Sequence, residues 1–195
     1  MTDVVVAGAG MAGLVAAAEA RRLSATPVVF EKLPRPGGSM RLSSGVIWRH
    51  RDFDRFLTEC PGGDPELQRV LFERLDGDLR WLESLGAPVL ERGTGNPLTT
   101  GVRFDPEGLT AALVDAAGGR APAGAVRLAA PLREPPAGSL LILATGGFAA
   151  DRELVRKHVT AEAAHLLLRA APGSTGDGLR LGLAAGAAVG AGLPE

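Results

Sequence analysis

The sequence predicts an α/β fold with a central parallel sheet, and the amino-terminal third carries the two observations behind that prediction. Residues 3–8, DVVVAG, and residues 26–31, TPVVFE, are short apolar runs rich in β-branched residues. Such runs are typical of strands that are buried on both faces of a parallel sheet. Between them, residues 11–24 predict a helix whose small side chains allow a close approach to the sheet. Strand, helix and strand within about 30 residues form a βαβ unit.

The middle of the chain predicts a loop followed by two helices. Residues 33–45 are rich in glycine, proline and serine, as loops are. Residues 65–86 predict an amphipathic helix with one apolar stripe, formed by Leu67, Leu71, Leu75, Leu79 and Leu82. Residues 106–119 predict a second helix, with a proline in its first turn and a pair of glycines at its end.

The last third predicts a strand and two helices. Residues 139–143, SLLIL, indicate another buried strand, which runs into a glycine turn at residues 144–147. Asp151 then stands where it can cap a short helix over residues 152–159. A Thr-Gly-Asp-Gly turn at residues 175–178 opens a final helix rich in alanine and glycine.

Composition limits the class of protein. The chain has 195 residues, 46% of them hydrophobic, so it can bury the core of one full domain. A net charge of −1 gives no electrostatic reason to expect nucleic acid or an anionic membrane as a partner. The single cysteine, Cys60, excludes an internal disulfide and suits a reducing compartment. No signal peptide or membrane-spanning run is visible, so we expect a cytoplasmic protein.

Residues 8–13 form a Gly-x-Gly-x-x-Gly motif between the first strand and the first helix. In such motifs the first glycine permits the tight turn, the second admits a pyrophosphate, and the third lets the helix pack on the strand. Glu31 stands 18 residues beyond Gly13 at the end of the second strand, where an acidic residue binds a ribose. The combination predicts a Rossmann-like dinucleotide site. The alternative is a glycine-rich turn in an ordinary α/β protein.

Four stretches then resemble one family in their order along the chain. They are VVVAGAGMAGLVAAAEA, FEKLPRPGGSMRLSSGVIW, ILATGGFAAD and STGDGLRLGLAAGAAVG. The sequence is similar to the FAD-binding flavoproteins of the fumarate reductase and succinate dehydrogenase type, which include ketosteroid dehydrogenases and enzymes like tricarballylate dehydrogenase. The resemblance implies a Rossmann-like FAD-binding domain with a central parallel sheet.

The resemblance also implies which residues bind the cofactor. They are Gly8, Gly10, Ala12, Gly13, Glu31, Lys32, Gly38, Ser39, Ser43, Ser44, Gly45, Ala144, Thr145, Gly146 and Asp177. Ser44 stands where the family usually has glycine. For Ser43 and Ser44 a solvated turn explains the residues equally, and Asp177 could instead be a helix N-cap. Some relatives hold flavin covalently through a histidine of the flavin-side loop. Residues 37–45 contain no histidine, which predicts non-covalent FAD.

In the family, a cap domain and a final flavin-completing segment follow the Thr-Gly-Asp-Gly helix. We therefore expect residues 1–195 to form an incomplete FAD-binding domain that lacks both parts, with Glu195 at the edge of an interrupted fold. A partner chain or a second copy could then cover the exposed face. Because the acid-base groups of the family belong mainly to the parts not seen, no catalytic residue is assigned. Arg49 and His50 follow the flavin-side loop, but no motif supports a role for them, and no histidine pair has the spacing of metal ligands.

Three functions agree with these observations. The first is an FAD-dependent oxidoreductase, or the nucleotide-binding part of one, that transfers hydride between flavin and a small organic substrate. The second is a catalytically inert FAD-binding module or subunit that needs a partner chain. The third is an NAD-binding Rossmann protein, although the loop after Glu31 and the Thr-Gly-Asp-Gly turn are not needed for NAD alone. The carboxylate of Glu31 would repel the 2′-phosphate of NADP.

Overall fold

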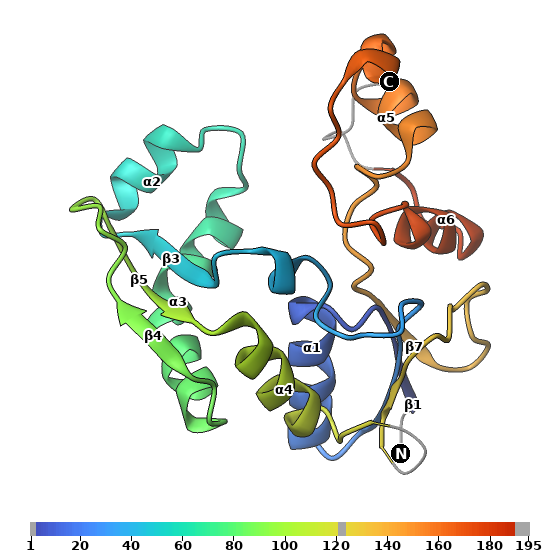
Figure 1. The fold of residues 1–195 in the computed structure, drawn as a ribbon, viewed down its shortest axis with the longest axis horizontal. Coiled ribbons are helices and arrows are strands. Elements are labelled where there is room, and N and C mark those ends of the chain that lie inside the picture. Colours follow the sequence, from blue (N-terminus) through green and yellow to red (C-terminus); the bar gives the residue numbers. More distant parts are fainter. Residues whose placement is uncertain (1–2, 121–123, 190–195) are drawn as a thin grey trace. The chain divides into compact units, whose positions relative to one another are not determined.

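The computed structural model describes residues 3–120 and 124–189, so the expected edge at Glu195 lies outside the described residues. The chain divides into two compact units. The first comprises Met1–Leu42 with Leu113–Glu195, and the second comprises Ser43–Ala112. Figure 1 labels the elements of both units.

The first unit is built on a four-stranded parallel sheet in the order β6-β2-β1-β7. Its strands are β1 (Asp3–Ala7), β2 (Thr26–Phe30), β6 (Val126–Arg127) and β7 (Leu140–Leu143). Helix α1 (Met11–Arg22) joins β1 to β2 and packs on both, which confirms the predicted βαβ unit. Val4 and Val6 of β1 and Leu14 and Ala17 of α1 are all buried in the core between the strand and the helix.

Beyond the sheet, the first unit carries short helices on long loops. They are the 3₁₀ helix η1 (Gly38–Leu42), α5 (Arg152–His158), the 3₁₀ helix η2 (Ala161–His165) and α6 (Asp177–Ala184). As predicted, Asp151 caps α5, because its carboxylate accepts hydrogen bonds from the backbone N–H groups of Glu153 and Leu154. Figure 1 shows α5 and α6 in the orange and red part of the chain, after β7.

The prediction that residues 139–143 form a buried strand is wrong in one respect. The strand forms as β7 and pairs in parallel with β1. However, β7 stands at the edge of the sheet that the described residues build, and the side chains of Leu140 and Leu143 are 56% and 43% exposed. The apolar run reflects strand formation, whereas burial depends on a neighbour that local sequence does not encode.

The second unit contains an antiparallel sheet that the sequence analysis did not predict. Its order is β3-β5-β4, with β3 (Val46–His50), β4 (Val89–Arg92) and β5 (Thr99–Phe104). Helices α2 (Phe53–Glu59) and α3 (Pro65–Ser84) pack on β3 and on one another. Helix α4 (Pro106–Ala116), which follows β5, continues into the first unit.

The predicted leucine stripe of α3 is wrong for the first half of the helix. Leu79 and Leu82 are buried, but Leu67 and Leu71 are 69% and 47% exposed. Repeated steps of four residues rotate a stripe by about 40° each, because one residue turns about 100°. The inner face instead begins with Gln68, which is buried and donates to the Cys60 carbonyl, and Phe72, whose ring contacts Phe53. Together with Leu75, Leu79 and Leu82, these two residues are spaced by alternating steps of four and three, which keep side chains on one side of a helix.

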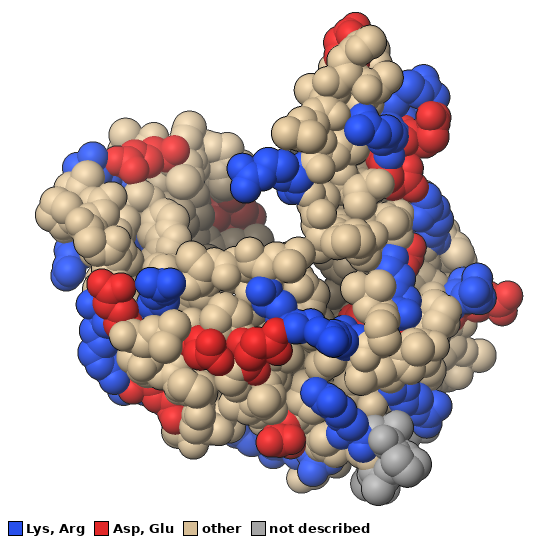
Figure 2. Space-filling model, in the orientation of Figure 1, with Lys and Arg blue, Asp and Glu red and all other residues tan. Residues whose placement is uncertain are grey.

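Charged side chains of both signs lie on the surface of both units (Figure 2). Basic and acidic side chains are interspersed on the face of each unit that Figure 2 shows. Many form exposed pairs within a helix, such as Arg22 with Glu19 and Arg156 with Glu153. Along residues 3–120 and 124–189, every helix falls short of the length and apolarity that crossing a bilayer requires.

Candidate functional site

A cavity of about 890 Å³ lies in the first unit, where the strands of the parallel sheet end. Ala7 and Gly8 line it from the end of β1, Phe30 and Glu31 from the end of β2, and Leu143 from the end of β7. The crevice beyond the carboxyl ends of parallel strands is where open α/β sheets bind ligands. Its volume lies within the range of about 300–1,000 Å³ of small-molecule sites.

The three glycines of the motif have three different environments. Gly8 has φ +104°, and a Cβ there would collide with the Ala144 carbonyl. Gly13 lies in α1, and its Cβ would collide with the Gly8 carbonyl. At Gly10, by contrast, a Cβ would meet no protein atom within 4 Å. Gly8 and Gly13 are therefore needed for packing, whereas the protein itself gives no steric reason for glycine at position 10, which lines the cavity.

Helix α1 begins at this cavity, and no side chain caps its first turn. Its N-cap is Gly10, no side chain accepts a hydrogen bond from its first turn, and that turn has no acidic residue. The first N–H groups of a helix have no intrahelical partner and carry a partial positive charge. A phosphate group that enters the cavity would therefore meet N–H donors without displacing any side chain.

Glu31 joins two loops of the cavity. Its side chain is buried, with 7% of the residue exposed. Oε2 accepts a hydrogen bond of 2.9 Å from the Ala9 N–H in the glycine motif, and Oε1 accepts one of 2.9 Å from the Leu33 N–H in the following loop. Each carboxylate oxygen has a second lone pair, so the group can still accept from a ribose hydroxyl. Glu31 is thus a structural link as well as the predicted ribose ligand.

The turn after β7 meets the start of α6 at the same cavity. The Thr145 hydroxyl accepts a hydrogen bond of 2.9 Å from the Gly178 N–H, and a Cβ on Gly178 would collide with that hydroxyl. The N-cap of α6 is Gly176 in the left-handed region at φ +77°, which has no side chain to cap the helix, so the Thr145 hydroxyl takes over part of that role. Two helices with glycine N-caps, α1 and α6, therefore begin at the wall of one cavity.

Asp177 is the first residue of α6 and does not cap the helix, which argues against the N-cap alternative. Its Oδ2 accepts a hydrogen bond of 2.7 Å from the Lys32 ammonium, and its Oδ1 accepts one of 3.0 Å from the Thr175 hydroxyl. Burial acts to raise the pKa of the Asp177 carboxyl. Hydrogen bonds from Lys32 and Thr175, with the charges of Lys32 and Arg180, outweigh it and hold that pKa below its ordinary value.

Most of the predicted site residues line this cavity. Those that do are Gly8, Gly10, Ala12, Glu31, Lys32, Gly38, Ser39, Ala144, Thr145, Gly146 and Asp177. Gly13 stands behind the wall, where it packs against Gly8. Ser43, Ser44 and Gly45 belong to the second unit and are not among the lining residues, so their contact with a cofactor stays a prediction. In that unit the Ser43 hydroxyl accepts a hydrogen bond from the Gly45 N–H, as in a short turn.

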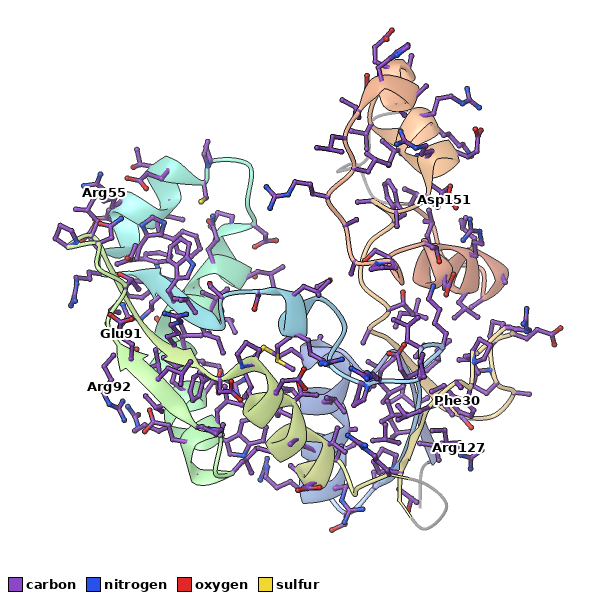
Figure 3. All side chains as sticks on the ribbon, viewed as in Figure 1. Phe30, Arg55, Glu91, Arg92, Arg127 and Asp151 are labelled. Carbon is purple, nitrogen blue, oxygen red and sulfur yellow. The ribbon has the colours of Figure 1, made fainter. Side chains whose placement is uncertain are left out.

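Several residues of the wall were not predicted from the sequence. They are chiefly Leu33, Pro34, Arg35 and Pro36 after β2, Pro131 and Leu132 after β6, and residues 171–174 before the Thr-Gly-Asp-Gly turn. The first group could have been found, since the LPRPGG stretch begins only two residues after Glu31. In the structure its Gly37 N–H donates to the Ala9 carbonyl at 2.7 Å. Beside the cavity's sheet, Figure 3 shows Arg127 next to Phe30, with the guanidinium carbon 5.3 Å from the ring centre.

Two residues that the sequence placed after the flavin-side loop have structural partners in the second unit. Arg49 forms an ion pair of 2.7 Å with Asp76 and lies 4.5 Å over the Phe72 ring. His50 is buried and stacks on Phe56 at 5.2 Å between ring centres. In the part of the chain that the structure describes, no three His, Cys, Asp or Glu side chains gather as a metal site.

The parallel sheet, the glycine motif at the uncapped start of α1 and the acidic residue at the end of β2 define a dinucleotide-binding protein. A family model described as "FAD binding domain" matches residues 3–135, more than half of the chain. The chain therefore belongs to this FAD-binding family, as the resemblance predicted.

Curated relatives agree with this assignment. The fumarate reductase (cytochrome) of Shewanella frigidimarina is 31% identical over 107 residues, which cover 47% of this chain and 19% of that protein. A 3-oxosteroid 1-dehydrogenase of Mycolicibacterium smegmatis is 50% identical over 46 residues, or 24% of this chain and 8% of that protein. The chain thus spans less than a fifth of the length of the curated relatives that it matches.

Solved structures share the fold. A flavocytochrome c3 fumarate reductase in its open conformation superposes with a TM-score of 0.76 at 21% identity, covering 93% of this chain and 40% of that chain. The 3-ketosteroid-Δ4-(5α)-dehydrogenase of Rhodococcus jostii RHA1 superposes with a TM-score of 0.74 at 20% identity, covering 96% of this chain and 54% of that chain. This chain has the fold of part of each.

Proposed function

We propose that the chain binds FAD non-covalently in the cavity of the first unit, as the nucleotide-binding part of an FAD-dependent oxidoreductase. The observation that carries the proposal is the open start of α1. Gly10 lines the cavity with room for a Cβ, and no side chain caps the helix. A glycine with free space beside it and N–H donors behind it suits a pyrophosphate that approaches the backbone closely.

The other lining residues fit the same ligand. The remaining lone pairs of the Glu31 carboxylate would accept hydrogen bonds from the adenosine ribose, next to its own bonds to Ala9 and Leu33. The turn of Ala144 and Thr145 and the start of α6 also line the cavity. A bound flavin supplies hydride-transfer chemistry, and the protein supplies binding, orientation and electrostatics.

A second candidate is an FAD-binding module without catalysis of its own. One observation favours it: three charged groups in this wall, those of Glu31, Lys32 and Asp177, are already engaged by the protein. Both oxygens of Glu31 accept backbone hydrogen bonds, and Lys32 is paired with Asp177. The lining residues of the cavity include no histidine or cysteine that could hold a proton at neutral pH. In this reading a small organic substrate and its acid-base groups would belong to another polypeptide.

The test is the visible absorption spectrum of the purified chain before and after incubation with FAD and desalting. We expect a flavin band that survives desalting and is fully released when the protein is denatured, because the binding is non-covalent. Gly10→Val should bind FAD at least about tenfold more weakly, because its side chain would fill the phosphate position. A parent chain that retains no FAD would contradict the proposal, and retention of NADH instead would favour the nicotinamide alternative.

The matched control is Gly62→Val in the second unit. Gly62 is exposed, and a Cβ there, as at Gly10, would have no protein atom within 4 Å. The two variants therefore add the same side chain to open space, one at the cavity and one away from it. FAD retention should fall only in Gly10→Val, while the thermal unfolding midpoints of the two apo variants should stay within a few degrees of the parent.

A further inference from the structure

We propose that Lys32, Thr175 and Asp177 form an ionic clasp that joins two walls of the cavity and slows the release of the bound dinucleotide. The inference rests on the proposed function for the identity of the ligand. In this role the three residues are positioning residues, because they act by holding the loop after β2 against the start of α6.

The contacts of the clasp connect distant parts of the chain. The Lys32 ammonium donates to the Thr175 hydroxyl and, at 2.7 Å, to Oδ2 of Asp177, across 143 and 145 residues of sequence. The side chains of Lys32 and Asp177 are only 26% and 33% exposed, so water screens their attraction less than at an open surface. Both residues line the cavity, one from the loop after β2 and the other from the start of α6.

The same two segments are packed tightly beside the ion pair. At Gly173, a Cβ would come within 3.0 Å of the Leu33 side chain and 3.5 Å of the Lys32 side chain. The loop before α6 therefore lies directly on the loop after β2. The loop after β2 and the loop before α6 are thus already in contact where the ion pair joins them. Loss of the ion pair would therefore increase the mobility of both loops.

Helix α5 anchors the clasp from behind. Arg180 of α6 donates to the Thr175 carbonyl, and its Nη2 donates to Oδ2 of Asp151 at 2.6 Å. Asp151 also caps α5, and Figure 3 shows it at the start of that helix. Hydrogen bonds from the backbone of Leu154 and from Arg180 hold the pKa of the Asp151 carboxyl below its ordinary value. The Thr-Gly-Asp-Gly turn is thereby fixed on both sides.

The clasp also explains why Lys32 is unsuited to hold phosphate directly. An ammonium has three donors, and two of those of Lys32 are used by Thr175 and Asp177. Its charge is balanced by that of Asp177. Phosphate contact then falls to other groups of the cavity, chiefly the backbone N–H groups at the start of α1, and Lys32 would affect ligand release only through the wall that it holds.

Acid should open the clasp. The charged groups that face Asp177 are Lys32 from the loop after β2 and Arg180 from α6, and Asp151 of the α5 cap acts through Arg180. Because the pKa of Asp177 is lowered in the folded chain, its stabilising contribution is complete above the ordinary value of 3.8. The contribution is lost as pH falls through the lower folded-state pKa.

The main experiment measures the rate of FAD release from the full chain by flavin fluorescence after dilution, at low and high salt. Lys32→Met and Asp177→Asn should each speed release about three- to tenfold, and the double variant no more than either single variant. Salt should speed release from the parent more than from the variants. The control is Arg92→Met, which removes the 2.8 Å pair with Glu83 in the second unit and should leave release unchanged.

Two results would overturn the clasp. If Lys32→Met weakened FAD binding while Asp177→Asn strengthened it, Lys32 would be a direct phosphate ligand whose charge Asp177 partly cancels. If neither variant changed the release rate, the ion pair would not limit release. Both patterns differ from the shared, non-additive acceleration that a clasp requires.

A second readout needs no flavin. Amide hydrogen exchange in residues 171–178 of the apo chain should be about three- to tenfold faster in Lys32→Met than in the parent, and unchanged in Arg92→Met. Unchanged exchange would overturn the clasp even if FAD binds. A parent chain that retains no FAD would instead contradict the proposed function, and faster exchange in Lys32→Met would then still establish the link between the two walls.

Discussion

Helices α1 and α3 begin in opposite ways. Helix α3, in the second unit, has Asp64 at its N-cap, whose carboxylate accepts hydrogen bonds from the N–H groups of Glu66 and Leu67. A proline and an acidic residue follow in its first turn. Helix α1 has a glycine cap, no capping side chain and no acidic residue in its first turn.

The contrast extends to the other helices. An aspartate side chain accepts from the first turns of α2, α4 and α5 as well, through Asp52, Asp105 and Asp151. Only α1 and α6 among the described α-helices have glycine N-caps, and these two begin at the cavity. In α6 the Thr145 hydroxyl accepts from the Gly178 N–H, so of the described α-helices only α1 starts without a side-chain acceptor. A helix that satisfies its first N–H groups serves the fold, whereas α1 leaves them open at the cavity, which forgoes some stability and keeps donors for a ligand.

The largest effect on stability is expected for Gly13→Ala, which tests whether this glycine serves packing. Its Cβ would collide with the Gly8 carbonyl and lie 3.2 Å from the Ala144 side chain. The free energy of unfolding, measured with urea on the apo chain, should fall by about 3 kcal/mol. Gly77→Ala in α3 is the control, because its Cβ would meet only the end of the Arg80 side chain at 3.9 Å. That change should raise the free energy of unfolding by about 1 kcal/mol.

A gain of stability in both variants would contradict the packing role. Gly13 would then be an ordinary helix glycine like Gly77, and the close approach of α1 to the end of β1 would not depend on it.

The next largest effect is expected for Glu31→Gln, which tests whether Glu31 serves the fold and the ligand together. A glutamine places an NH₂ group against one of the two backbone donors, Ala9 or Leu33, that the carboxylate now satisfies. Unfolding of the apo chain should become easier by about 2 kcal/mol, and FAD affinity should fall as well. If FAD affinity fell while apo stability stayed unchanged, Glu31 would be a ligand residue only.

The features that sequence predicts well in this chain are local. The first strand, α1 and the second strand follow from their own residues, and the three glycine roles follow from the position of the motif between them. The cap of α5 by Asp151 is equally local, since donor and acceptor lie within three residues. These signals depend on backbone geometry over a few residues, and that geometry is determined by the local sequence.

What could not be predicted depends on distant pairing. Strand β5 contains a glycine opposite Trp48, and no local pattern reveals that Thr99–Phe104 pairs with Val46–His50 across about 50 residues. The exposure of β7 depends on the absence of a further strand among the described residues. The contact of Lys32 with Asp177 spans 145 residues, and only the fold brings the two together. Many residues that line the cavity were predictable, but their bonds to one another were not.

The smallest effect on stability is expected for Gly10→Asp, which gives α1 the kind of cap that α3 has. Gly10 is extended, at φ −76° and ψ −178°, and its Cβ would meet no protein atom, so an aspartate can take the N-cap conformation that it prefers. The free energy of unfolding should rise by a few tenths of a kcal/mol, about the difference between an aspartate and a glycine cap. FAD retention should nevertheless be lost, because the carboxylate would occupy the N–H donors and repel the phosphates. The reverse exchange, Asp64→Gly, should lower stability by a similar few tenths of a kcal/mol and leave FAD retention unchanged. A Gly10→Asp chain that still binds FAD like the parent would mean that the open start of α1 is not where the pyrophosphate lies.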